Sequence, residues 1–497
     1  MENNVSIKQP NFKKNIFFNF IVQFLTYLIP LVVSPYISHI FGSNGVGTYS
    51  YANSIVSFFS IAISFGFLSY GNKVIAQLRN DRQEYSNKFW SILIVRDLSF
   101  LVVSAVFFSL LFTGFFGEET DTKIYLILSF TLLEQTLNIT FLFQGLEKFK
   151  KIAIANLVMN VIFIICIFVF VRTSDDFMNY VWIKATQLIV TDLFLWIFSI
   201  GYISKPILSK INLIEPIKGA LPFLIATIAP TISATIDKTM LGKMVSISEV
   251  GIYEQPLKII SLVSGLVYAI SPVILSRMSL LYKEKKQEEI NSKIADVFEL
   301  LYLIAFPAIG GLYCLSRFFI PIYFGEDFYS SINVIYCLIP IILFSPFSSL
   351  VFSSYYYPVG KGNQVGLMFV LSVSINVITS YFLIKVLGAS GAALGSLIAE
   401  FVLALLASCF SWKQINFIAI WKHSWKALTS SIIMTGIVFV CSYLTNLFGL
   451  SKLATTIIGL AIGIFTYLLL CILFKEKLIV SGLNKIFKRK KDSQSNL

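Results

Sequence analysis

Residues 18–76 read FNFIVQFLTYLIPLVVSPYISHIFGSNGVGTYSYANSIVSFFSIAISFGFLSYGNKVIA. The stretch carries two long apolar runs, which we place at 15–41 and 46–70, joined by a short glycine-containing turn. A helix of about 20 apolar residues crosses a hydrocarbon core about 30 Å thick. The stretch therefore predicts two successive membrane-spanning helices.

The same pattern continues to the end of the chain, with short polar connections between further apolar runs. The chain is 56% hydrophobic and 13% charged, which is more apolar surface than a soluble protein of 497 residues can bury. We therefore expect an all-α, polytopic integral membrane protein with about 14 transmembrane helices. The expected spans are 15–41, 46–70, 89–113, 123–144, 152–171, 178–201, 219–242, 250–273, 296–320, 331–354, 365–386, 389–410, 427–447 and 453–474.

The basic residues alternate from one connection to the next. With the N-terminus inside, 29 of the 39 lysines and arginines fall on the inner side, six on the outer side and four within spans. Because inner loops of membrane proteins are enriched in Lys and Arg, this bias places both termini in the cytoplasm. The topology also explains the net charge of +13, so we expect no nucleic-acid partner.

Cysteine and histidine usage excludes several kinds of site. The six cysteines lie in or beside apolar spans without a CxxC pair, and the two histidines, His39 and His423, are far apart in sequence. This pattern predicts no disulfide framework, no metal centre and no catalytic histidine constellation. We expect a protein that has no cofactor and is not an enzyme.

An internal repeat relates two parts of the chain. Residues 46–58 read VGTYSYANSIVSF and residues 250–262 read VGIYEQPLKIISL, with Val, Gly, Tyr, Ile and Ser matched in register. The offset of 204 residues covers six expected spans, so both copies share one orientation and form a parallel repeat. This predicts two six-helix lobes with a parallel pseudo-two-fold axis, at 1–210 and 211–412. Two extra helices and a basic cytoplasmic tail would follow at 413–497.

Ionisable residues inside the expected spans are candidates for function. Each costs at least about 2.5–3.5 kcal/mol at the centre of a bilayer, so such residues usually face a cavity or a partner. The basic ones are Arg96, Lys184, Lys238 and Lys258, and the acids of interest are Glu134, Asp192, Asp237 and Glu400. Arg96 lies roughly 10 Å into its span at 1.5 Å per residue, which is too deep for easy snorkelling. Structural ion pairs, helix-end charges and hydrogen-bonded packing stay open as alternative interpretations of all of them.

Two blocks of the sequence resemble a known family. The first holds Pro30, Pro35, the turn Gly42-x-x-Gly45-x-Gly47-x-Tyr49-Ser50 and the segment from Phe65-Gly66 to Tyr70-Gly71. The second is IDKTMLGKMVSISEVGIYEQPLKI, at the junction of the seventh and eighth spans. Both are similar to the bacterial polysaccharide repeat-unit flippases, a branch of the superfamily that includes the multidrug and toxin extruders.

The resemblance implies a substrate and a place of action. It implies an undecaprenyl-pyrophosphate-linked oligosaccharide that is turned from the cytoplasmic to the outer leaflet of a bacterial plasma (inner) membrane by alternating access, for surface polysaccharide synthesis. Such a ligand needs cations for its pyrophosphate, and the candidates are Arg96, Lys258, Lys184 and Lys238, with Arg96 first. A polysaccharide polymerase and glycosyltransferases would be partners, besides the substrate and the membrane lipids.

Three other functions are weighed against this one. A small-molecule extruder of the same fold would favour acids in its cavity, and a peptidoglycan-precursor flippase is hard to separate by sequence. A membrane glycan polymerase or ligase would need a sizeable outer loop, and the outer connections here are short.

The membrane-embedded acids also suggest energy coupling. Mid-span carboxyl groups can bind H⁺ or Na⁺ in turn with a substrate. Asp192 and Glu400 have suitable depth, and Glu134 and Asp237 are further candidates for coupling or for lining the cavity.

Overall fold

The computed structural model describes residues 12–116, 122–268, 270–476 and 478–479. Every regular element in these residues is helical, which confirms the all-α prediction. The predicted basic tail after residue 479 lies outside the described residues. The chain divides into two compact units, Met1–Lys258 with Asn363–Ala399, and Ile259–Gly362 with Glu400–Leu497. The predicted lobes, 1–210 and 211–412, have other boundaries than these two units, because they are derived from the internal repeat. The division into units does not test them, so they stay a prediction.

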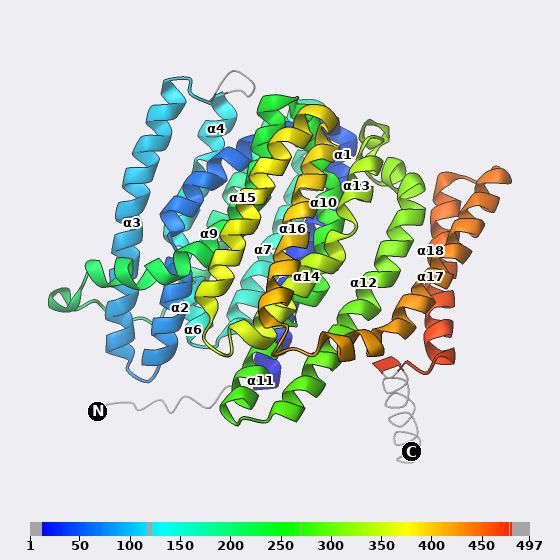
Figure 1. Ribbon diagram of the computed structural model, residues 1–497. Coiled ribbons are helices and arrows are strands. Elements are labelled where there is room, and N and C mark those ends of the chain that lie inside the picture. Colours follow the sequence, from blue (N-terminus) through cyan, green and yellow to red (C-terminus); the bar gives the residue numbers. More distant parts are fainter. Residues whose placement is uncertain (1–11, 117–121, 269, 477, 480–497) are drawn as a thin grey trace, which may run out of the picture. The chain divides into compact units, whose positions relative to one another are not determined.

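The first unit contains most of the spans that the sequence predicts in the N-terminal half. Its first helix is kinked at Gly42, whose φ of 61° separates two helices that correspond to the expected spans 15–41 and 46–70. In Figure 1, α15 and α16 run side by side in yellow and orange, and the Ser372 hydroxyl donates to the Ala399 carbonyl between them. The helices of this unit are α1 (Phe12–Ser64), α2 (Phe67–Leu78), α3 (Arg82–Phe112), α4 (Thr122–Leu128), α5 (Phe130–Leu137), α6 (Thr140–Gly145), α7 (Phe149–Phe170), η1 (Ser174–Asp176), α8 (Phe177–Ser199), η2 (Leu208–Lys210), α9 (Ile214–Met244), α10 (Ile247–Tyr268) up to residue 258, α15 (Gly362–Leu387) and α16 (Ala389–Ser411) up to residue 399.

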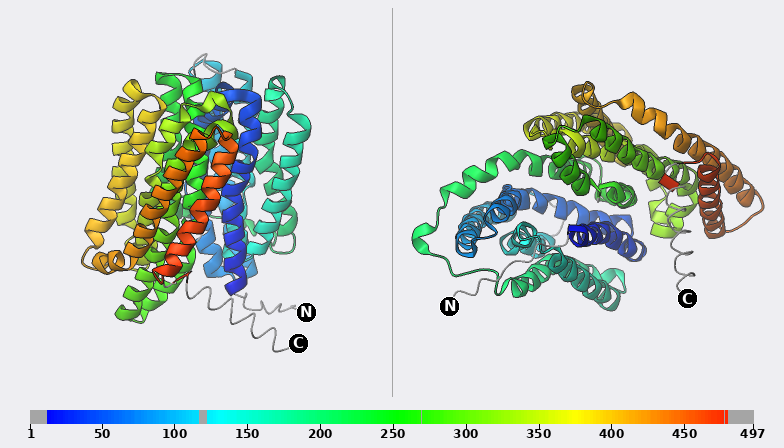
Figure 2. Two further views of the ribbon diagram at one scale, coloured as in Figure 1. Left: turned by 90° about the vertical axis from the view of Figure 1, so that its right-hand side faces the viewer. Right: turned by 90° about the horizontal axis from the view of Figure 1, so that it is seen from below.

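The second unit holds the remaining spans. The last two helices, orange and red in Figure 2, pack on each other and on α12, so the expected extra pair belongs to the core of this unit. The expected span 331–354 is broken into two α-helices and a π-helical turn. Besides the ends of α10 and α16, the elements are α11 (Ser271–Lys283), α12 (Gln287–Phe324), η3 (Glu326–Phe328), α13 (Ser331–Leu338), α14 (Ile341–Val351), η4 (Phe352–Tyr356), α17 (Phe417–Leu447) and α18 (Lys452–Leu473).

The helix surfaces are those of a membrane protein. Among the described residues, 11 helical segments are long and apolar enough to span a bilayer, and one of them, Leu28–Leu78, contains parts of two expected spans. The predicted count of 14 is therefore not confirmed, although a helix occupies each expected span. On α3 the side chains of Leu101, Val102 and Phe112 are exposed, whereas Arg96 is fully buried. A soluble protein would bury the apolar side chains and expose the arginine. A lipid environment explains the opposite arrangement seen here, because apolar groups face hydrocarbon and polar groups face the protein interior.

The two copies of the repeat meet each other in the first unit. A Cβ atom at Gly47 would lie 1.9 Å from the Ile247 carbonyl oxygen, and one at Gly251 would lie 2.0 Å from the Ser43 carbonyl oxygen. Gly47 corresponds to Gly251, and Ser43 corresponds to Ile247, each at the offset of 204 residues. The contact is thus reciprocal, as a two-fold relation requires.

A second contact follows the same rule. The Gln255 amide donates to the Ser38 hydroxyl at 2.7 Å, and the positions equivalent to these two, Tyr51 and Gly242, also touch. Two reciprocal contacts at one offset support the parallel repeat. They also explain the matched glycines, since only a residue without Cβ lets the backbones of α1 and α10 approach so closely.

We expect Gly47→Ala and Gly251→Ala each to lower the free energy of unfolding by about 1–3 kcal/mol, because the added methyl group meets a backbone carbonyl. Thermal unfolding of the purified protein in detergent measures this. The matched control is Gly311→Ala, where an added Cβ meets nothing within 4 Å. A melting temperature for the two crossing variants at or above that of the control would contradict the close approach.

Candidate functional site

A polar cavity of about 510 Å³ opens inside the first unit. Helices α1, α5, α7, α8 and α10 enclose it, so residues from five segments of the chain converge there. Its apolar wall comes from α1 and α7, with Leu188 from α8. Its polar lining consists of Thr26, Ser34, Tyr49, Ser50, Asn53, Ser57, Ser60, Thr131, Glu134, Gln135, Asn156, Asn160, Tyr180, Lys184, Gln187, Glu254 and Lys258.

Lys184 reaches the cavity from α8. Its Nζ donates to the Gln187 side chain at 2.9 Å, and the Gln187 amide donates to Asn160 of α7 at 2.7 Å. The amine therefore belongs to a row of neutral amides that can hydrogen-bond a polar ligand.

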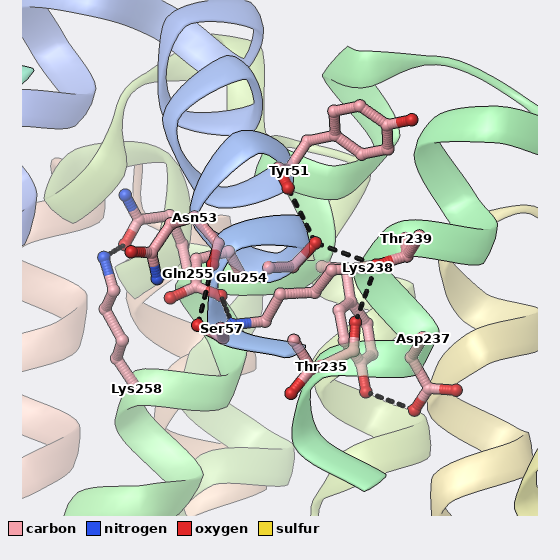
Figure 3. Close-up of polar contacts among 12 residues, drawn as sticks. Tyr51, Asn53, Ser57, Thr235, Asp237, Lys238, Thr239, Glu254, Gln255 and Lys258 are labelled. Atoms are coloured by element: carbon pink, nitrogen blue, oxygen red, sulfur yellow. Dashed lines mark hydrogen bonds and ion pairs between the residues drawn. The ribbon is translucent and has the colours of Figure 1, made fainter. Parts of the chain in front are cut away.

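Lys258 reaches the cavity from α10. Its Nζ donates to the Gln255 side chain at 3.1 Å, and Figure 3 shows the two side chains pointing toward each other. Glu254 lies one turn earlier on the same helix, but its carboxylate pairs with Lys238 of α9 at 2.6 Å. Within the described part of the chain, neither Lys184 nor Lys258 forms an ion pair. The cavity therefore presents two ammonium groups whose hydrogen bonds go to neutral amides, with the Glu254 carboxylate as a neighbour of Lys258 that is already paired with Lys238.

Arg96 lies elsewhere. Its guanidinium is fully buried and donates to the carbonyl oxygens of Thr136 and Asn138, the second at 2.6 Å. It does not line the cavity. The predicted role in binding pyrophosphate stays a prediction, and the contacts of this side chain are with the backbone where α5 ends.

Two of the predicted acids form a pair beside the cavity. The carboxyl groups of Glu134 on α5 and Asp192 on α8 are both buried and interact electrostatically with each other. Two neighbouring buried carboxyl groups repel each other when both are ionised, so such a pair favours binding one proton. Glu134 also accepts from the Gln135 and Asn138 amides and lines the cavity, which makes the pair a candidate proton site next to it.

Asp237 on α9 has a different environment. Its buried carboxylate accepts from the Tyr253 hydroxyl at 3.1 Å, the Ser380 hydroxyl at 2.9 Å and the Ser396 hydroxyl, and the Asn376 amide lies 3.4 Å away. These partners come from α10, α15 and α16, and all of them are neutral. A buried carboxylate without a cationic partner is costly, so this one calls for a small cation or a proton.

Glu400 lies in the second unit. Its carboxyl group interacts with Ser345, whose hydroxyl forms a hydrogen bond of 2.6 Å with the Tyr268 hydroxyl. Its Oε2 atom is buried without a hydrogen-bond partner among the described residues. A buried carboxylate oxygen without a donor is costly, which makes Glu400 a candidate site for a proton.

The structure brings some of the predicted site residues together and not others. Lys184, Lys258 and Glu134 share the cavity, Asp192 and Lys238 are bonded to residues that line it or lie beside it, and Arg96, Asp237 and Glu400 have separate surroundings. Sequence reasoning missed Glu254, Gln135 and Gln255. Glu254 stands four residues before Lys258, a spacing that puts both on one helix face and could have revealed it.

Comparison with known proteins gives a consistent picture. Residues 12–282 match the family model described as polysaccharide biosynthesis protein. A putative O-antigen transporter of Shigella dysenteriae is 23% identical over 401 residues, which cover 79% of this chain and 98% of that protein. The probable low-salt glycan biosynthesis flippase Agl15 of Haloferax volcanii is 21% identical, with 87% of this chain and 90% of that protein covered.

Solved structures share the fold. The lipid II flippase MurJ in an inward closed conformation superposes with a TM-score of 0.72 at 18% identity, covering 94% of this chain and 99% of that one. An inward-facing multidrug resistance MATE family transporter of the MOP superfamily gives a TM-score of 0.61 at 13% identity, covering 81% of this chain and 99% of that one. These likenesses confirm the predicted polytopic fold. Because the family model matches more than half of the sequence, the chain belongs to the polysaccharide biosynthesis protein family, as its first two spans and the junction at Asp237–Tyr253 predicted.

Proposed function

We propose that this protein is a flippase that moves undecaprenyl-pyrophosphate-linked oligosaccharide repeat units across a bacterial plasma membrane for surface polysaccharide synthesis. The observation that carries the proposal is the cavity of the first unit, in which two lysines without carboxylate partners face a lining of amides and hydroxyls. The family and the names of the relatives, which are transporters and flippases, support the same activity.

The lining matches the chemistry of such a substrate. A pyrophosphate is a compact anion, and ammonium groups form strong charge-assisted hydrogen bonds with its oxygens. Sugars present hydroxyl groups that both donate and accept, and the amides of Asn53, Gln135, Asn156, Asn160 and Gln187 do the same. We assign the pyrophosphate to Lys258 and Lys184 and the glycan to the amides. Lys238 acts indirectly, by neutralising Glu254.

The alternatives fit less well. A small-molecule extruder for cationic drugs would need a net negative cavity, and the ammonium groups of Lys184 and Lys258 disfavour one. A peptidoglycan-precursor flippase carries a similar lipid pyrophosphate, so the lysines favour it equally, whereas the family supports polysaccharide repeat units. A membrane polymerase or ligase is disfavoured because the relatives are transporters.

We further propose the direction of transport from the charge bias. The enrichment of Lys and Arg in alternate connections supports a cytoplasmic position for both termini and for residues 274–295, and with that orientation the substrate enters from the cytoplasmic leaflet. Glycosyltransferases would supply the loaded lipid there, and a polymerase would consume it on the outer side.

Ion coupling is the remaining element of the proposal, and Asp237 is the strongest candidate for it. Its carboxylate gathers three hydroxyl groups and an amide from three other helices, and hard cations such as Na⁺ prefer oxygen ligands of this kind. A cation or proton bound there would tie α9 and α10 to α15 and α16. Asp192, Glu134 and Glu400 are rival sites for a proton.

Replacing both Lys184 and Lys258 with Gln should weaken binding of the lipid pyrophosphate about 100-fold, because each charge-assisted hydrogen bond contributes about 1.5–3 kcal/mol. Binding of undecaprenyl pyrophosphate to the purified protein in nanodiscs measures this, and cells carrying the variant should make little surface polysaccharide. Lys150→Gln, at an exposed position of α7, is the matched control. Export at the parental rate by the double variant would refute the assignment.

Asp237→Asn should abolish the stimulation of flipping by an imposed Na⁺ or pH gradient, since the amide cannot carry the charge that binds a cation or proton. Flipping of a fluorescent lipid-linked oligosaccharide in proteoliposomes measures this with each gradient in turn. Asp97→Asn on α3 is the control, because Asp97 is exposed. If Asp237→Asn keeps the full response and Asp192→Asn or Glu400→Gln loses it, coupling resides in the rival acid.

Single cysteines at positions 175 and 283, in a protein without its native cysteines, test the orientation. Position 175 should react with an impermeant thiol reagent in intact cells, and position 283 only after the membrane is permeabilised. The reversed pattern would invert the proposed direction of transport.

A further inference from the structure

The helix that supplies one wall of the cavity ends inside its membrane span. After Leu137 the backbone leaves the helical conformation for two residues, Asn138 (φ −67°, ψ 106°) and Ile139 (φ −111°, ψ 21°), before α6 begins at Thr140. The last carbonyl groups of a helix have no intrahelical donor. In a bilayer no water replaces that donor, so each unpaired carbonyl costs several kcal/mol.

Two side chains satisfy three successive carbonyls at this end. Arg96 of α3 donates to the carbonyls of Thr136 and Asn138, and Nε1 of Trp196 on α8 donates to the carbonyl of Leu137 at 2.9 Å. The guanidinium also places a positive charge at the negative end of the α5 dipole. The ring of Phe141, in the next helix, lies 5.8 Å from the Arg96 Cζ atom. Helices α3 and α8 thus hold the end of α5 from two directions.

The held backbone connects directly to the cavity. The Asn138 amide donates to the Glu134 carboxyl at 3.0 Å, while its side-chain oxygen accepts from the Thr140 backbone N–H at 3.1 Å and hydroxyl at 2.6 Å. Glu134 lines the cavity together with Thr131 and Gln135 of the same helix. A shift of the α5 end therefore moves the polar wall that faces the ligand.

We infer that Arg96 and Trp196 are positioning residues that set which glycan the protein accepts, by fixing Thr131, Glu134 and Gln135 against the sugar part of the substrate. This inference rests on the proposed glycolipid function. A site built to hydrogen-bond hydroxyl groups discriminates strongly among ligands only when its polar groups are held in place. The proposed pyrophosphate contacts, Lys184 and Lys258, come from α8 and α10 and not from the end of α5 itself.

Conservative variants separate this role from folding. Trp196→Phe keeps an aromatic ring and removes the N–H donor, and Arg96→Lys keeps the charge and loses the two-pronged donor geometry. Arg79→Lys is the control, because Arg79 pairs with Glu147 at an exposed site. The measurement is the affinity of each purified variant for undecaprenyl pyrophosphate with and without its oligosaccharide.

We expect Trp196→Phe and Arg96→Lys to weaken binding of the glycan-bearing lipid about five- to tenfold, the effect of losing one or two hydrogen bonds, with the glycan-free lipid bound as by the parent. Equal losses for both lipids would mean that Arg96 contacts the pyrophosphate or serves only the fold, and they would overturn the inference. Unchanged affinities for both lipids would also overturn it.

Hydrogen exchange at the amides of residues 138–142 gives a second readout that needs no substrate. Both variants should exchange faster there than the parent, while Arg79→Lys should not. Parental exchange rates in both variants would overturn the inference. If the parent protein binds neither lipid, the proposed function fails, and the exchange rates still decide whether Arg96 and Trp196 hold the end of α5.

Discussion

Every polar group that lies within the bilayer must find a partner inside the protein, and this requirement accounts for most of the contacts described above. Arg96 and Trp196 donate hydrogen bonds to the free carbonyls at the end of α5. Lys238 forms an ion pair with Glu254, and four neutral groups donate to Asp237. Water meets such demands in a soluble protein, but lipid cannot. Against this background, Lys184 and Lys258 are unusual, because their hydrogen bonds go only to neutral amides, and the proposed function assigns the anion of the substrate to them.

The same requirement explains which features of the fold and of the site could be predicted from the sequence. The spans follow from hydropathy, because apolar residues that face lipid leave a direct trace in composition. Lys184 and Lys258 could be selected from the sequence as basic residues within spans, and both line the cavity. The matched residues of the repeat predict two equivalent pairs of spans, and the contact between the two copies appears only in the structure.

Arg96 marks the limit of that reasoning. Its depth follows from the sequence but its partners do not, because the break at Asn138 and Ile139 contains neither proline nor glycine, and a single asparagine is only a weak signal for a helix end. A buried cation near a broken helix end and a buried cation in a binding cavity have the same sequence signature. The serines around Asp237 were missed for a similar reason, since Ser380 and Ser396 are unremarkable until three helices bring them to one carboxylate.

The reciprocal crossing of α1 and α10 connects the repeat to the cavity. Gly47 and Gly251 touch the partner backbone, while Tyr49, Asn53, Glu254 and Lys258 line the cavity within about two turns of those glycines. Alternating access in such a protein requires that one mouth of the cavity close while the other opens. The contact is made mainly between backbones, and the described side-chain hydrogen bonds across it are those of Ser43 with Ser248 and of Gln255 with Ser38, both at 2.7 Å and both between neutral groups. Because the contact is reciprocal, a small rotation of α10 relative to α1 would break both halves of it together. Such a rotation would also move Lys258, which lies on α10 and lines the cavity.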